Sequence, residues 1–189
     1  QVHRRGGKVA DKQVQPRGQD IRKKAGLLGQ SLGLLRFTRI AEAKFSGEFK
    51  ERVLKVYALF PELAEHEVKC GYIRRGTRLL GTARGWAIPK QISLQPNVGR
   101  MTIAHELTHL LQGCNGVPHG EKACDIWAMA RLPAEMLDDQ PYYLLRHWRR
   151  ERWLHNRVQA KALCERAIEV RKVERNYIKW LSGELRQLK

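Results

Sequence analysis

The sequence predicts an α+β fold, in which a small, twisted, mostly antiparallel sheet is followed by two helices and a long C-terminal helical region. Short strand-like pieces punctuated by glycine and proline occur between Glu67 and Gln95. Two segments with helical spacing of apolar residues follow, at about 100 to 112 and about 120 to 131. From about Tyr142 to about Leu185 the pattern remains helical, with Arg or Lys at most turns. The 189 residues, 42% of them hydrophobic, suffice for one domain with a real core.

The first part of the chain predicts a basic flexible tail or arm over residues 1–26. This stretch carries many Lys and Arg and few apolar side chains, so it cannot bury enough surface to offset the entropy of ordering. We expect residues 27–35 to form a connector between this tail and the folded domain, with a helix as the alternative. Residues 45–60 predict a helix, because their apolar side chains recur at threes and fours and Pro61 ends the pattern.

Three strands are expected in the glycine-punctuated region, at 68–74, 79–88 and 91–94. In the C-terminal region, we expect the helix to be broken near Asn156. We expect residues 27–145 to form the main domain and residues 146–189 a basic C-terminal helical extension.

The first expected helix after the strands carries His105-Glu106-Leu107-Thr108-His109. Residues four apart on a helix lie one turn apart on the same side, which is the separation that two ligands of one metal ion require. Apolar residues occupy the other side of this helix, and Gly113 is placed to end it in a left-handed conformation.

The next helix offers a third ligand. Glu121 and Asp125 share one face of it, so Glu121 can reach the metal while Asp125 accepts a hydrogen bond from a ligand imidazole. His119 is the rival ligand, since imidazole suits zinc equally well. The alternative for Glu121 is a first-turn acid that the helix dipole favours without any metal.

The HELTH motif, followed at a short distance by Glu121-Lys122-Ala123-Cys124-Asp125, resembles the gluzincin clan of zinc metallopeptidases and is similar to its small members, the minigluzincins. The resemblance covers about residues 86 to 132. It implies that Zn²⁺ is bound by His105, His109 and Glu121, that Glu106 is the general base, and that Asp125 supports His105. The metzincin pattern fits less well, because Asn115 stands where that pattern has its third histidine.

The same resemblance implies a zincin-like domain of helices around a small twisted sheet, whose exposed edge strand pairs with an extended peptide. Residues 85–88 are the candidate edge. The expected reaction is hydrolysis of a peptide or protein substrate, with Glu106 taking a proton from a metal-bound water. A hydrogen-bond donor for the oxyanion of the reaction is also expected. Four downstream side chains are candidates for this role, with packing or surface exposure as the alternative: Tyr142, Tyr143, His147 and His155.

The net charge of +17 is concentrated in both flanks, while residues 61–145 are balanced. This distribution predicts a polyanionic partner, RNA or DNA, bound through residues 1–26 and 146–189. The alternative function is therefore a nucleic-acid- or ribosome-associated binding protein with a structural or relic zinc site. Trp148, Trp153 and Trp180 lie among arginines and are candidates for stacking on bases, or else belong to the core.

No apolar stretch is long enough to cross a membrane, and the first residues lack the apolar run of a signal peptide. The four cysteines form no CxxC pair, so we expect free thiols in a reducing cytoplasm, with a bridge between Cys114 and Cys124 as the alternative. A latent form, in which a terminal segment covers the cleft, is a further hypothesis that the small relatives suggest.

Overall fold

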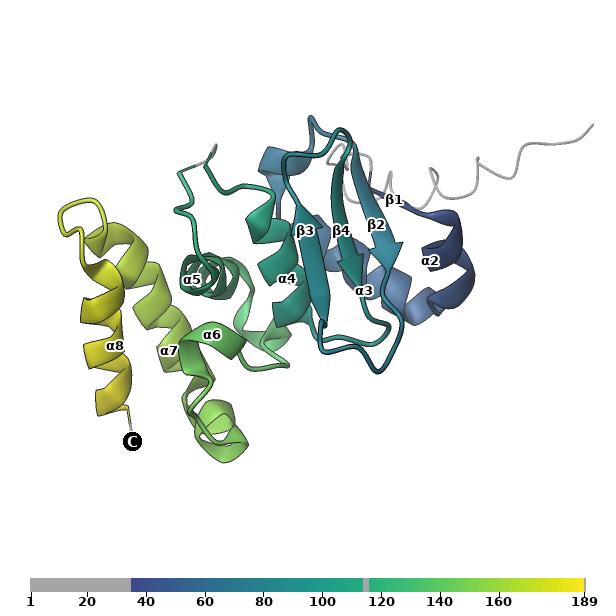
Figure 1. Ribbon diagram of the computed structural model, residues 1–189. Helices are drawn as coiled ribbons and strands as arrows, with labels where there is room; N and C mark the ends of the chain where they lie inside the picture. Colours follow the sequence, from purple (N-terminus) through teal and green to yellow (C-terminus); the bar gives the residue numbers. More distant parts are fainter. Residues whose placement is uncertain (1–34, 114–115, 189) are drawn as a thin grey trace, which may run out of the picture. The chain divides into compact units, whose positions relative to one another are not determined.

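The computed structural model describes residues 35–113 and 116–188 and has an α+β fold (Figure 1). The predicted fold class and the long C-terminal helical region are confirmed. The predicted tail, residues 1–26, and nearly all of the predicted connector lie outside the described residues.

Four strands form one sheet in the order β1-β2-β4-β3. They are β1 (Leu35–Phe37), β2 (Val68–Tyr72), β3 (Gly81–Arg84) and β4 (Lys90–Leu94). β1 and β4 pair with β2 in parallel, and only β3 and β4 are antiparallel.

The prediction of a mostly antiparallel sheet is therefore wrong. Strand β1 is only three residues long and was not recognised as a strand, and the helices between β1 and β2 return the chain so that these strands run in parallel. The β3–β4 hairpin then inserts β4 between β2 and β3, an order that strand patterns along the chain do not reveal.

Two helices connect β1 to β2, and each begins at a side-chain cap. α2 (Arg39–Lys44) is capped by Thr38, and α3 (Gly47–Tyr57) by Ser46, whose hydroxyl accepts a hydrogen bond from the Phe49 backbone N–H. α3 buries Phe49, Val53 and Val56, as the helical spacing predicted. A 3-10 turn, η2 (Pro61–Leu63), follows.

The first of the remaining helices lies against the sheet, and the others follow on the side of that helix that faces away from the sheet (Figure 1). α4 (Arg100–His109) packs on β3, β4 and α3, and α5 (Glu121–Arg131) packs on α4. After η3 (Ala134–Met136) and the short α6 (Tyr142–Leu145), α7 (Arg150–Val170) packs on α5, and α8 (Tyr177–Gln187) packs on α7. This arrangement places α4 and α5 side by side in the interior.

The hydrophobic core runs without interruption across residue 146. Trp153, Cys164 and Leu181 from the C-terminal helices belong to the same cluster as Ile92 and Leu107. The charge-based boundary between 145 and 146 thus lies within a continuous core.

One expectation about the C-terminal region is wrong. Asn156 lies inside α7, where its amide donates to the Arg152 carbonyl oxygen, and the chain breaks instead between Val170 and Tyr177. Of the two roles considered for Trp153, stacking on a base or packing in the core, the structure shows the second, because this side chain is fully buried. Its place in the core follows from the packing of α7 on α5.

Within the described ranges, no helix combines the length and apolar character needed to cross a membrane. Cys70, Cys124 and Cys164 are buried free thiols, so Cys124 does not form the bridge considered as an alternative. Cys114 lies outside the described residues.

Candidate metal centre

Helix α4 carries both histidines and obtains its N-terminal cap from a distant segment. Its N-cap residue, Gly99, has no side chain, and the first turn contains no acid. Asp138 accepts from the Arg100 N–H at 2.8 Å, and Asp139 accepts from the N–H groups of Met101 and Thr102 at 2.7 and 3.2 Å. These two carboxylates satisfy donors that a helix start leaves unpaired and so fix the position of α4.

The apolar face of α4 is buried as predicted, in the residues Ile103, Ala104, Leu107, Leu110 and Leu111. The opposite face is also largely enclosed, because α5 and β3 pack around it. His105 and Glu106 are only 8% and 7% exposed. Gly113 adopts φ +78°, which is the left-handed conformation expected after the last turn.

The two imidazoles and one carboxylate converge on a single point. His105 Nε2 lies 3.1 Å from His109 Nε2. Glu121 Oε2 lies 3.0 Å from His105 Nε2 and 3.3 Å from His109 Nε2. A tetrahedral zinc ion with N and O ligands holds two ligand atoms about 3.3 Å apart. The three atoms are therefore spaced as the ligands of one ion.

The outer nitrogen of each imidazole fixes which ring nitrogen faces this point. Asp125 Oδ1 lies 2.7 Å from His105 Nδ1, and a carboxylate only accepts, so Nδ1 carries the proton. The Gln112 amide nitrogen donates to the Pro118 carbonyl oxygen, which turns its oxygen toward His109 Nδ1 at 2.8 Å. Both Nε2 atoms thus present lone pairs, which a cation can bind.

Asp125 also holds the start of α6. Its Oδ2 accepts from the backbone N–H groups of Tyr143 and Leu144 at 2.8 and 2.7 Å, which ties α6 to α5. The Tyr143 ring consequently stacks on the His105 ring, with centroids 5.7 Å apart and planes inclined by 20°. Asp125 is only 1% exposed. The structure therefore places it as predicted, behind His105.

A second donor set shares the two histidines. His105, His109 and Cys124 offer ligand atoms that lie within 4.8 Å of one another. The Cys124 sulfur, however, lies 3.2 Å from His109 Nδ1, the nitrogen that Gln112 already holds. The two nitrogens of an imidazole point away from each other, so an ion on the Nε2 atoms faces Glu121 rather than Cys124. Burial, with the nearby carboxylates of Glu121 and Asp125, also raises the pKa of the Cys124 thiol, which disfavours the thiolate that binds metals.

The rival ligand His119 lies elsewhere. A Cβ atom added to Gly113 would meet His119 Nε2 at 3.0 Å, so this imidazole packs against the turn that follows α4. His119 is exposed, and no contact between its imidazole and His105 or His109 is found among the described residues.

Glu106 lies on α4 between the two histidines and faces β3. A Cβ atom added to Gly81 would lie 2.5 Å from Glu106 Cγ and Oε1, so the glutamate side chain occupies the space that this glycine leaves open. Burial raises the pKa of Glu106 to about 7. His105 lowers this pKa when its imidazole is protonated, and the carboxylate of Glu121 raises it further. A carboxyl group with such a pKa can both accept and return a proton near neutral pH.

For His105 the balance is different. Burial opposes the charged imidazolium, but the carboxylates of Asp125, Glu106 and Glu121 outweigh burial and raise the His105 pKa. This concentration of negative charge around the imidazoles also favours a bound cation.

Among the four oxyanion candidates, Tyr143 is the one that contacts a predicted ligand. Burial and the carboxylates of Glu121 and Glu106 raise its pKa, so the phenol stays protonated and can donate. Tyr142 packs edge-on against Tyr143, while His147 accepts a hydrogen bond from Arg146 and His155 is exposed on α7.

The sequence analysis missed Gln112, Gly81 and the Asp138–Asp139 pair. Gln112 had a usable signal, because it lies three residues after His109 and so near the same helix face. Gly81 and the two aspartates act across the fold, and no local spacing marks them. No family model, curated protein or solved structure matches this chain.

Proposed function

We propose that the protein is a zinc-dependent peptidase of the gluzincin type. The observation that carries this proposal is the convergence of His105 Nε2, His109 Nε2 and Glu121 Oε2 within 3.0 to 3.3 Å, with Asp125 behind His105. Three protein ligands are typical of catalytic zinc, since they leave one position for water or substrate.

The chain supplies a proton acceptor beside this position. Zinc bound there would lower the pKa of a coordinated water and polarise a scissile carbonyl. Glu106 can take the water's proton and pass it to the leaving amine, because its side chain is buried on α4 between the two histidine ligands. Tyr143 is the donor best placed to stabilise the oxyanion, through its stacking on His105.

The edge of the sheet offers a place for an extended peptide. β3 is the outer strand beside α4, and it pairs only with β4 among the described strands. The candidate edge at 85–88 is thus misplaced by a few residues: the edge strand is Gly81–Arg84, and 85–88 form the turn after it. Lys90 holds this turn on α4 by donating to the carbonyl oxygens of Gly85 and Leu110.

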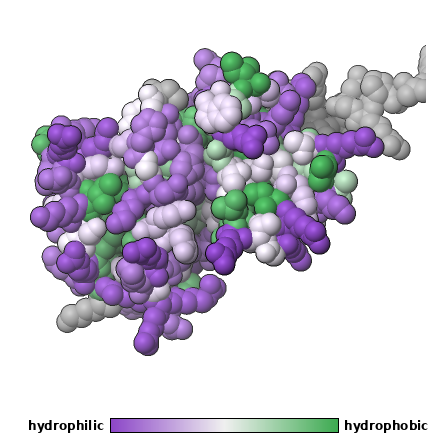
Figure 2. All heavy atoms as spheres, viewed as in Figure 1, coloured by the Kyte–Doolittle hydropathy of each residue, from purple (hydrophilic) through white to green (hydrophobic). Residues whose placement is uncertain are grey.

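Exposed apolar side chains flank this edge strand on both sides: Leu79, Leu80, Trp86 and Ile88. The face of the molecule shown in Figure 2 is otherwise mostly hydrophilic, with small hydrophobic patches. A peptide added as a further strand would make main-chain hydrogen bonds with β3 and place its side chains against these residues.

The test is hydrolysis of a mixed peptide library by zinc-loaded protein. We expect cleavage by the native chain and a loss of at least about 100-fold in the Glu106→Gln variant, which removes the proton acceptor but keeps the side chain's shape. Equal, background-level turnover in both proteins would rule out the peptidase proposal.

A second candidate function rests on charge. The net charge is +17, and two arginines of α7, Arg152 and Arg166, lie over Trp148 and Trp180 at 4.5 and 5.3 Å from the ring centroids. We propose as the alternative that the chain binds RNA or DNA through residues 1–26 and 146–189. Binding should then weaken steeply with salt and be largely lost without residues 1–26. A flat salt response would contradict this alternative.

We also propose a reducing, cytoplasmic location, since Cys70, Cys124 and Cys164 are buried free thiols. The metal is proposed to be zinc, although the same ligands also accept cobalt, iron or nickel. Latency remains a prediction, which a gain in activity after trimming either terminus would support.

A further inference from the structure

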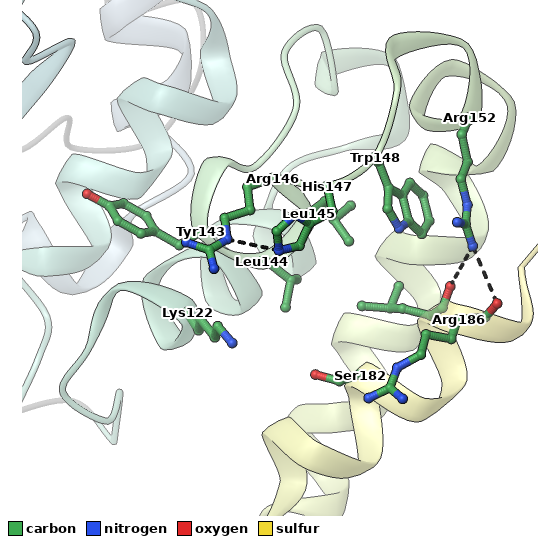
Figure 3. A pocket seen from close by; sticks show the side chains of 11 residues that line it. Lys122, Tyr143, Leu144, Leu145, Arg146, His147, Trp148, Arg152, Ser182 and Arg186 are labelled. Atoms are coloured by element: carbon green, nitrogen blue, oxygen red, sulfur yellow. Dashed lines mark hydrogen bonds between the residues drawn. The ribbon is translucent and has the colours of Figure 1, made fainter.

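A basic pocket lies next to the candidate metal centre. It has a volume of about 360 Å³ and is formed by the start of α5, by α6 and the turn after it, and by α7 and α8 (Figure 3). Pockets of this size accommodate small ligands or a few side chains.

The lining is strongly cationic. Lys122, Arg146, Arg152 and Arg186 contribute their side chains, and no Asp or Glu is among the described residues that line the pocket. In Figure 3 the charged ends of Lys122 and Arg186 turn toward the space between α6 and α8, while the Arg146 guanidinium lies next to His147, to which it donates a hydrogen bond. Like charges gathered in a concave site raise the local positive potential, so an anion is favoured there.

Arg152 is held in place by the fold. It donates to the carbonyl oxygens of Leu185, Arg186 and Leu188 at the end of α8, and its guanidinium lies 4.5 Å from the Trp148 ring centroid. Arg146 donates only from Nε, to His147. The ion pairs formed among the described residues include none with Lys122, Arg146 or Arg186, so no carboxylate neutralises these three positive charges.

The pocket is connected to the proposed metal ligands through two residues of its lining. Tyr143 lines it and stacks on His105, and Lys122 follows Glu121 in the sequence. Apolar side chains from Leu144, Trp148 and Leu185 complete the lining and can contact the methylene groups of a longer side chain. A peptide bound at the metal would therefore have a neighbouring residue within reach of the three cations.

We propose that this pocket binds acidic side chains of the peptide substrate on one side of the scissile bond, so that the peptidase prefers Asp- or Glu-containing sequences. The inference rests on the proposed peptidase function for its choice of ligand. A peptide is favoured over nucleic acid as the occupant because the cations are confined to a partly apolar pocket beside the metal ligands.

The test separates binding from cleavage by using zinc-loaded Glu106→Gln protein. Two labelled peptides are compared by fluorescence anisotropy, identical except that one carries Asp and Glu where the other carries Asn and Gln. We expect the acidic peptide to bind roughly 3- to 10-fold more tightly, since several partly exposed ion pairs add. Adding Arg146→Gln and Arg186→Gln should remove this preference.

The matched control carries Arg175→Gln and Lys179→Gln, which remove the same charge from exposed positions outside the pocket. It should keep the preference, and circular dichroism and zinc content should be unchanged in both variants. Equal binding of the two peptides, or an unchanged preference in the pocket variant, would overturn the inference. So would a single-stranded oligonucleotide of equal charge that binds more tightly than the acidic peptide and depends on Arg146 and Arg186.

The two proposals fail in different ways. Pocket-dependent binding of the acidic peptide, with no cleavage by zinc-loaded native protein, would remove the peptidase proposal and leave the pocket assignment standing. Cleavage without any preference for acidic sequences would remove the pocket assignment alone.

Discussion

At the scale of single residues, Asp125 connects the proposed metal ligands to the surrounding fold. One of its oxygens accepts from His105 Nδ1, and the other accepts from two backbone N–H groups at the start of α6. Both oxygens are buried acceptors with donors already aligned, so the residue has little freedom to move. His105 therefore has a fixed tautomer and a fixed ring orientation before any metal binds.

Asp125→Asn tests this role. An amide presents one oxygen and one NH₂ group, so either His105 or the N–H groups of Tyr143 and Leu144 would face a donor instead of an acceptor. We expect zinc affinity to fall about 10- to 100-fold, measured by competition with a chromogenic chelator. Native zinc affinity in Asp125→Asn would contradict the assignment.

The residues that the sequence did predict are those whose placement is local. His105 and His109 are one helical turn apart, as are Glu121 and Asp125, so each pair is placed by its own helix. Gln112 was missed although the same reasoning applies, because glutamine is less often considered a partner of a ligand imidazole.

At the scale of elements, the closeness of β3 to α4 places Glu106. Gly81 leaves the space in which the Glu106 side chain lies. Any larger residue would push the carboxylate away from its position beside the ligands. The contact joins the edge strand to the helix that carries His105 and His109.

Gly81→Ala should therefore reduce kcat roughly 10- to 100-fold, since a displacement near 1 Å of a catalytic group has such an effect. Zinc content should stay unchanged, because the ligands lie on α4 and α5. Gly183→Ala is the matched control: a Cβ there meets nothing within 4 Å, and it should leave kcat unchanged while raising the free energy of unfolding by about 0.5 to 1 kcal/mol. Undiminished kcat in Gly81→Ala would mean that Glu106 acts from another position.

The cap on α4 predicts a pH dependence of stability. Burial and the neighbouring Asp138 raise the pKa of Asp139 to about 7, whereas in the unfolded chain it is about 4. Between these values the folded state binds more protons than the unfolded state, so stability falls as pH rises. The pKa of Asp138 is lowered despite its burial, through its hydrogen bonds with Asp139 and Arg100. Asp138 therefore changes the stability only at a pH below the range in which Asp139 titrates.

The measurement is urea unfolding of the native chain and Asp139→Asn at pH values from about 5 to about 8, with the variant fixed in the neutral form. Relative to the variant, the native chain should lose roughly 1 to 3 kcal/mol over this range. Parallel pH profiles for the two proteins would show that Asp139 does not titrate here.

Element positions were easier to predict than their pairing. The helices at 100–109 and 121–131 lie within two or three residues of their predicted bounds, because their periodicity is local. The parallel sheet and the Asp138–Asp139 cap depend on segments tens of residues apart, which local patterns do not relate.

At the scale of the whole molecule, one core supports both the metal centre and the basic pocket. α7 packs on α5, so the helix that carries Glu121 and Asp125 is held between α4 and the C-terminal helices. The predicted basic extension is thus structurally joined to the ligand helix, although its charge pattern alone suggested an appendage.

Trp153→Ala tests this dependence. Trp153 is fully buried in α7, and its truncation should lower the free energy of unfolding by about 3 to 5 kcal/mol. Val173→Ala, at a position that is 90% exposed, should have little effect. For the native chain, tryptophan fluorescence and far-ultraviolet circular dichroism should report one transition, whereas an earlier separate transition of the C-terminal helices would contradict a shared core.

The account depends most on which side chains hold the metal, and elemental analysis of zinc in purified variants tests this directly. Native protein, Cys124→Ala and His119→Ala should each retain an equimolar amount of zinc after gel filtration, and Glu121→Gln should lose most of it. Zinc retained by Glu121→Gln and lost from Cys124→Ala or His119→Ala would contradict the His105, His109 and Glu121 site and the peptidase proposed from it.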